Sequence, residues 1–185
     1  MRPIVCVVLL LGTLLHLSHA TLAFDQEIDW PSAKSLHDFQ ARDLSGNLIN
    51  LEKYRGHVLV LLNGATRSCP VSAKGFKLLQ QLKERHGSKG LEVASFVVDG
   101  LVKPSGTAED IKEYVQSTGL TYDVYDKIAT DGDAAHPLYK WIKMCLEDKV
   151  QAGSKVLFDK NGKIVAKFGP TGSPAGLEEA IEQLL

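Results

Sequence analysis

The stretch HVLVLLNGATRSCP, which runs from His57 to Pro70, decides the fold of this chain. Its first part, 57–62, has the length and apolar composition of a buried strand, and the helical spacing of the apolar residues after Pro70 predicts an amphipathic helix. Cys69 therefore stands where a strand passes into a helix, at the cap position. Helix N–H groups and the positive end of the helix dipole face such a position, and Arg67 is close in sequence. Both favour the thiolate, which is the reactive form of cysteine.

Length and charge indicate a single domain without a strongly charged partner. The chain has 185 residues, with 21 Lys and Arg against 22 Asp and Glu, so its formal net charge is -1. A chain of this size can bury a substantial core in one domain. Near-neutrality argues against nucleic acid or an anionic membrane as an obligatory partner.

The N-terminus predicts a secretory signal peptide. Arg2 precedes the apolar run 4–15, and Ser18-His19-Ala20 offers a cleavage site with small residues, so we assign residues 1–20 to the signal. The apolar run is too short for a membrane span, and we expect no transmembrane segment in the mature protein.

The mature chain is expected to consist of an N-terminal extension, 21–34, and a folded domain, 35–185. Signal cleavage removes Cys6 and leaves Cys69 and Cys145, which are too few for a disulfide framework. The chain ends in Glu-Gln-Leu-Leu rather than in a retention tetrapeptide. We therefore expect a secreted, extracellular protein rather than a resident of the endoplasmic reticulum.

The rest of the chain alternates between strand and helix signals, and two hairpins are marked by their turn residues. The predicted elements are a hairpin over 39–51, strands at 57–62 and 91–98, helices after Pro70, at 110–118, 137–145 and 175–185, and a hairpin over 155–168. This order predicts an α/β protein with the thioredoxin fold: a central mixed sheet flanked by helices, with an N-terminal β-hairpin.

Four motifs together resemble the glutathione peroxidase family. They are Leu51-Glu52-Lys53-Tyr54-Arg55-Gly56, Asn63-Gly64-Ala65-Thr66, Ala135-His136-Pro137-Leu138-Tyr139-Lys140 and Pro170-Thr171-Gly172-Ser173-Pro174. The similarity spans residues 35–185 with at most small gaps, so the chain is identified as a divergent member. The resemblance implies a thioredoxin fold and the reduction of hydroperoxides by a thiol.

The same resemblance implies that the catalytic positions of the family are substituted here. The peroxidatic position falls on Ser68, one residue before Cys69. The family's glutamine falls on Gly100, and its Trp-Asn pair falls on Gln151 and Ala152. In the family these side chains donate hydrogen bonds that hold the chalcogen ionised, and glycine and alanine have no side-chain donor.

Three interpretations of Cys69 stay open. Thr66-Arg67-Ser68-Cys69-Pro70 resembles the Thr-x-x-Cys-Pro of peroxiredoxins, which would make Cys69 a displaced peroxidatic thiol with Thr66 orienting the peroxide. Alternatively, Cys69-Pro70-Val71-Ser72 is a monothiol Cys-x-x-Ser site for mixed disulfides, although Gly153-Ser154-Lys155 lacks the proline that such enzymes place there. The third interpretation is a buried or bonded cysteine on a scaffold that has lost its activity.

Cys145 is predicted to share a helix face with Leu138, Trp141 and Ile142, which would make it a small buried hydrophobic residue. The alternative is a disulfide with Cys69. That bond requires the two α-carbons to lie within about 7 Å of each other. It would either remove the nucleophile or act as its resolving step.

No metal site is predicted. The histidines His37, His57 and His86 are scattered and lack the spacing and partner cysteines of zinc sites. The acidic residues around Gly132 are Asp123, Asp126, Asp131 and Asp133. They do not match the calcium-loop pattern, so a solvated loop is expected. His136, just before the helix at Pro137, is expected to cap or pack rather than to catalyse.

The expected function is that of a glutathione-peroxidase-like thiol oxidoreductase with altered or strongly reduced activity. It would reduce hydroperoxides as part of the response to oxidative stress, with glutathione or another thiol as reducing co-substrate and no bound cofactor. The alternative is a catalytically inactive secreted protein of the same fold that binds an unknown protein or lipid. Cys69 favours the enzyme, whereas Gly100, Gln151 and Ala152 favour the binding protein.

Overall fold

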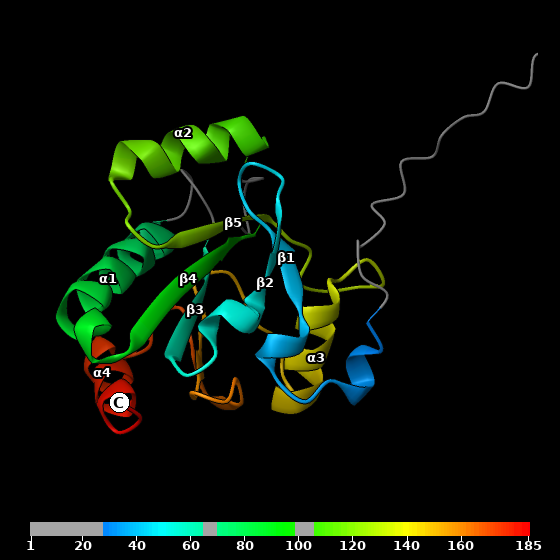
Figure 1. The fold of residues 1–185 in the computed structure, drawn as a ribbon. Coiled ribbons are helices and arrows are strands. Elements are labelled where there is room, and N and C mark those ends of the chain that lie inside the picture. Colours follow the sequence, from blue (N-terminus) through cyan, green and yellow to red (C-terminus); the bar gives the residue numbers. More distant parts are fainter. Residues whose placement is uncertain (1–27, 65–69, 99–105) are drawn as a thin grey trace, which may run out of the picture.

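The computed structural model describes residues 28–64, 70–98 and 106–185, and these form a five-stranded sheet with helices on both faces (Figure 1). The strands are β1 (Gln40–Arg42), β2 (Leu48–Asn50), β3 (Val58–Gly64), β4 (Leu91–Val97), β5 (Asp123–Lys127), β6 (Lys155–Phe158) and β7 (Ile164–Phe168). The α-helices are α1 (Pro70–His86), α2 (Ala108–Thr118), α3 (Pro137–Leu146) and α4 (Pro174–Glu182). Short 3-10 helices are η1 (Trp30–Ser32), η2 (Leu36–Asp38), η3 (Leu51–Tyr54) and η4 (Gly87–Lys89).

The sheet is mixed, as predicted, and β3 lies at its centre. The strand order is β5-β4-β3-β6-β7. β3 runs parallel to β4 and antiparallel to β6, β4 runs parallel to β5, and β6 and β7 form an antiparallel hairpin. β1 and β2 pair separately as the predicted N-terminal hairpin.

The two largest hydrophobic cores cover the two faces of the sheet. All seven residues of β3 are buried, and its successive side chains point to opposite faces. Leu59 and Leu61 belong to the core under α3 and the β1–β2 hairpin. Val60 and Leu62 belong to the core under α1 and α4. Burial on both faces explains why this strand is continuously apolar rather than alternating.

Helix α2 begins two residues before the predicted start, and its capping box gives the reason. The Thr107 hydroxyl accepts a hydrogen bond from the Asp110 N–H, and the Asp110 carboxylate accepts one from the Thr107 N–H. These reciprocal bonds satisfy helix-terminal donors that would otherwise need water. The helix ends at Gly119, whose φ of 66° lies in the left-handed region, as predicted.

β5 was not predicted from the sequence, and the interpretation of the acidic residues around Gly132 as one solvated loop was partly wrong. Asp123 and Asp126 are strand residues of β5, whereas Asp131 and Asp133 do lie in an exposed loop. Aspartate is depleted in strands, so the pattern Asp-Val-Tyr-Asp-Lys gives a weak strand signal. β5 tolerates it because it is an edge strand, where the Asp123 side chain stays 37% exposed.

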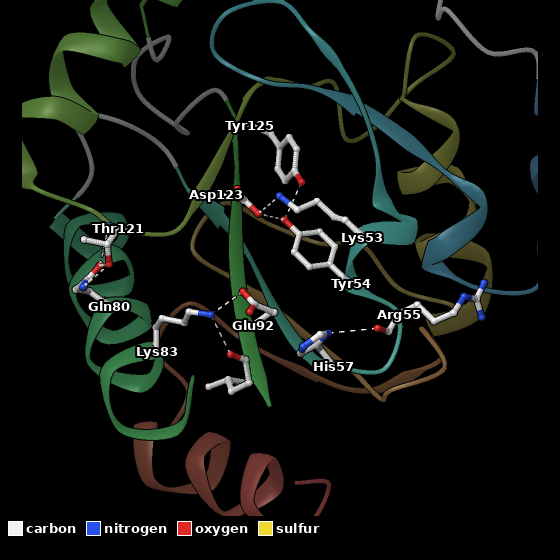
Figure 2. Close-up of polar contacts among 11 residues, drawn as sticks. Lys53, Tyr54, Arg55, His57, Gln80, Lys83, Glu92, Thr121, Asp123 and Tyr125 are labelled. Carbon is white, nitrogen blue, oxygen red and sulfur yellow. Dashed lines mark hydrogen bonds and ion pairs between the residues drawn. The ribbon is translucent and has the colours of Figure 1, made fainter. Parts of the chain in front are cut away.

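A tyrosine pair ties η3 to β5 (Figure 2). The Tyr54 hydroxyl donates to Asp123 Oδ2 at 2.6 Å and lies 2.7 Å from the Tyr125 hydroxyl. Lys53 Nζ donates to the same carboxylate oxygen at 2.7 Å. Burial raises the pKa of both tyrosines, so both stay neutral phenols. This satisfied network closes the segment before β3 onto the edge of the sheet.

A second buried hydrogen bond ties α3 to β3. Tyr139 is fully buried, and its hydroxyl donates to Asn63 Oδ1. Asn63 is itself fully buried near the end of β3. Because a buried amide oxygen needs a donor, this bond fixes the position of α3 against the central strand.

Replacing Tyr139 with Phe removes that donor and leaves Asn63 Oδ1 buried without it. We expect the free energy of unfolding to fall by about 1–3 kcal/mol, the cost of an unsatisfied buried acceptor. Urea unfolding of the Tyr139→Phe variant measures this change. The same substitution in an Asn63→Ala background should cost much less, and an equal cost in both backgrounds would show that the hydroxyl acts elsewhere.

His136 is the N-cap of α3, so the expected capping role is confirmed. Its Nδ1 accepts a hydrogen bond of 3.2 Å from the Leu138 N–H. Burial lowers the pKa of His136 to about 4, well below the ordinary value near 6.5. The folded protein therefore holds this imidazole neutral in a pH range where the unfolded chain protonates it.

Stability should consequently decrease as the pH falls from 6.5 toward 4, because only the unfolded chain takes up the proton. For His136 alone, the free energy of unfolding should fall by about 2 kcal/mol between pH 7 and pH 5. Urea unfolding of the protein and of His136→Asn, which keeps a cap but does not titrate, isolates this effect. Burial also lowers the pKa of His37, so the stability of both proteins should decrease further as the pH falls, by the same amount in each. Parallel pH profiles for the two proteins would contradict the assignment.

Candidate functional site

The candidate site lies where β3 ends and α1 begins. β3 ends at Gly64 and α1 begins at Pro70, as the sequence predicted. Four predicted site residues, Thr66, Ser68, Cys69 and Gly100, lie outside the described residues, and their roles stay predictions. The described residues fix the chain on both sides of the 65–69 segment.

Asn63 anchors a distant segment to this end of β3. Its backbone N–H donates to the Ser154 carbonyl at 2.9 Å, and its carbonyl accepts from the Gly153 N–H at 2.6 Å. Its side-chain Nδ2 donates to the Val150 carbonyl at 3.1 Å. With the bond from Tyr139, both ends of the Asn63 amide are satisfied. The 150–154 segment is therefore held in one position beside the candidate site.

Gly153 is required by this connection. Its φ is 86°, in the left-handed region that residues with a side chain rarely adopt. The Ser154 N–H donates to the Gln151 carbonyl at 3.0 Å, which closes a turn over 151–154. This turn brings the chain back into β6 at the correct register, with Lys155 opposite Leu62 of β3.

Gln151 and Ala152 lie in that turn, directly after the residue that Asn63 binds. Gln151 is exposed and Ala152 is half-buried. Ala152 has no polar side-chain atom, and the Gln151 amide makes no hydrogen bond within the described residues. The structure thus places Gln151 and Ala152 beside the end of β3, where Ala152 offers no side-chain donor and the Gln151 amide is exposed.

The other end of the 65–69 segment is fixed by close packing of α1 on β3. A Cβ at Gly64 would overlap the Phe76 ring, and one at Gly75 would press on the Leu62 side chain at 3.1 Å. Glycine at both positions lets the helix approach the strand closely. On the β4 side, the Val98 N–H donates to the Gly64 carbonyl at 2.8 Å, and position 100 follows two residues later.

Lys155 is a charged residue of this region that was not among the predicted site residues. It is only 5% exposed, and its Nζ donates to the Pro170 carbonyl at 3.3 Å. Burial lowers the pKa of its ammonium group. The one signal for it in the sequence is a lysine at the start of an otherwise apolar strand, which is also a common surface pattern.

Cys145 is exposed, so its predicted burial on the α3 face was wrong. Leu138, Trp141 and Ile142 are buried as predicted, but Cys145 belongs to the last turn of α3, where Lys143 and Met144 are exposed as well. Partial desolvation raises the pKa of its thiol, and the charge of Lys163 opposes this shift. Cys145 forms no disulfide with any described residue, and since Cys69 is not described, their pairing stays a prediction.

Within the described ranges, no helix has both the length and the apolar character needed to cross a membrane.

Comparison with known proteins identifies the family. The family model for glutathione peroxidase matches residues 36–143. The phospholipid hydroperoxide glutathione peroxidase of Callithrix jacchus is 35% identical over 159 residues, which cover 82% of this chain and 80% of that protein. The Sus scrofa protein of the same name is 34% identical over 180 residues, covering 92% and 90%.

A solved structure gives the same result. The crystal structure of Trgpx in its apo form matches with a TM-score of 0.66 and 25% identity, covering 83% of this chain and 96% of the other. This likeness, the mixed sheet and the flanking helices confirm the predicted thioredoxin fold. Because the family model matches more than half of the chain and the curated relatives are about 35% identical over 82% or more of it, the chain belongs to the glutathione peroxidase family.

Proposed function

We propose that this protein is a secreted thiol peroxidase that reduces hydroperoxides with glutathione or another thiol, at a rate strongly reduced by the substitutions at its site. Membership of the family supports a thiol-peroxidase-like function. The observation that supports a reduced rate is the turn bound by Asn63. This turn is in place beside the site, but its side chains are those of Gln151 and Ala152.

The proposed chemistry uses Cys69 as the nucleophile. Its thiolate attacks one peroxide oxygen, the O–O bond breaks, and the products are a cysteine sulfenic acid and, after protonation, an alcohol or water. A first thiol then condenses with the sulfenic acid, releasing water and forming a mixed disulfide. A second thiol attacks that disulfide, which restores Cys69 and releases the oxidised thiol as a disulfide. No bound cofactor is needed.

The missing donors limit the first step. Charge develops on the departing peroxide oxygen as the O–O bond breaks, and preorganised donors stabilise such charge most effectively where water is excluded. Ala152 offers no donor, and the exposed Gln151 amide is free to rotate in solvent. The thiolate is therefore expected to react with little help from the side chains of the 150–154 segment.

The names of the relatives suggest a class of peroxide. The two curated relatives described above are named phospholipid hydroperoxide glutathione peroxidases. We therefore include a phospholipid hydroperoxide, as well as hydrogen peroxide, among the substrates to be tested.

The second candidate function is a catalytically inactive secreted protein that binds a protein or lipid partner. The observation that favours it is the same turn, since Ala152 has no side-chain donor and the Gln151 amide is exposed to solvent, which leaves a folded scaffold without preorganised donors at this place. The two functions differ in whether Cys69 reacts with peroxide faster than an ordinary thiol.

Stopped-flow measurement of the purified protein against hydrogen peroxide and a phospholipid hydroperoxide tests the proposal. We expect a second-order rate constant at least about a hundredfold below that of an intact cysteine-containing family member, because loss of one such donor typically costs that much. The rate should still exceed that of a free thiol at the same pH and should vanish in Cys69→Ser but not in Cys145→Ser.

Two outcomes would contradict the proposal. A rate equal to that of the intact member would show that the substituted positions are dispensable. A rate no higher than that of a free thiol for both peroxides would leave the binding protein as the better account.

A further inference from the structure

Outside the candidate site, one group of metal-ligating side chains converges from two helices. His86 is the last residue of α1, and Glu178 and Glu182 lie on α4, which packs beside this end of α1 (Figure 1). The imidazole nitrogen and one oxygen of each carboxylate all lie within 4.8 Å of one another. His86 lies more than 90 residues before the two glutamates in the sequence, which is why the scattered histidines gave no metal signal.

The imidazole is the fixed member of this group. His86 is only 4% exposed, and its Nε2 lies 2.7 Å from Glu178 Oε1. Its Nδ1 is buried and forms no hydrogen bond with any described residue. Because no described group donates a hydrogen bond to Nδ1, Nδ1 can carry the proton of the neutral imidazole. Nε2 is then free to bind a metal through its lone pair.

The two carboxylates are suitably placed and leave one side open to water. Glu178 and Glu182 are four residues apart on α4, so they project from the same face of the helix. Glu178 is half-buried and Glu182 is exposed. Ligand atoms around a metal lie about 3–4 Å from one another when each bond is about 2.0–2.2 Å long. Glu182 can reach this spacing by a rotamer adjustment because it is exposed.

Among the described residues, the Glu182 carboxylate also lacks a cationic partner. Within the described part of the chain Glu182 has no ion pair, although like charges four residues apart on a helix repel each other. Arg85 binds both oxygens of Glu178, at 2.9 and 3.0 Å, but its side chain is 48% exposed. This bidentate pair competes with a metal for Glu178, so a dication must displace Arg85 from at least one carboxylate oxygen.

We propose that His86, Glu178 and Glu182 bind a transition-metal dication, with Zn²⁺ as the first candidate. One imidazole nitrogen and two carboxylate oxygens match the ligands of Zn²⁺ better than those of Ca²⁺ or Mg²⁺, which prefer oxygen alone. Water completes the coordination on the exposed side. The ion joins the end of α1 to α4 and so stabilises the packing of the two helices.

This site is separate from the proposed peroxidase site. α1 has 17 residues, and at a rise of about 1.5 Å per residue its two ends are about 24 Å apart. The metal is therefore expected to act on stability rather than on the peroxide reaction.

Calorimetric titration of the chelator-treated protein with ZnCl₂, together with its melting temperature, tests the site. We expect saturable binding of one ion and a melting temperature that rises with Zn²⁺ concentration. Glu182→Gln should weaken binding at least about tenfold, while the matched control Glu179→Gln, also exposed on α4, should not. Arg85→Gln should tighten binding because it removes the competing cation.

Glu182→Gln is informative because Glu182 has no ion pair in the described structure and repels Glu178, so the melting temperature of the metal-free variant should not fall. Absence of saturable binding, or binding that is equal in Glu182→Gln and Glu179→Gln, would overturn the proposal.

Discussion

The hydrogen bonds of Asn63 are the constraint on which the site depends. One buried residue near the end of the central strand binds the 150–154 segment through its backbone and its side chain, and its amide oxygen accepts from Tyr139 of α3. A buried amide left unpaired is costly, so each of these partners contributes to holding the others in place. Asn63 therefore places the 150–154 segment next to the end of β3, after which the chain continues to Cys69.

This arrangement separates the scaffold of the site from its chemistry. The core on both faces of β3, the close approach of α1 at Gly64 and the turn at Gly153 do not depend on which side chains occupy 151 and 152. Those positions can therefore change without loss of the fold. A family member with reduced or lost activity is the expected product of such changes, and fold alone does not decide between the two.

Sequence could predict the elements whose signals are local. The apolar run of β3, the proline at the start of α1 and the turn between β6 and β7 each carry their own pattern, and all were found. β5 was missed because its aspartates suit an edge strand, a property that only the assembled sheet reveals. Cys145 was misplaced because periodicity does not tell where the core ends along a helix. The convergence of His86 with Glu178 and Glu182 depends on helix packing and has no local signal.

The central claim is that the scaffold is intact and that its donors have been lost. The most direct test restores the family pattern as a block, with Ser68→Cys, Cys69→Gly, Gly100→Gln, Gln151→Trp and Ala152→Asn, and compares its rate constant for peroxide with that of Ser68→Cys alone. Groups that act on one sulfur are strongly non-additive, so the block should recover far more activity than the single change. If Ser68→Cys alone recovered most of the activity, the loss of donors would not be what limits this protein.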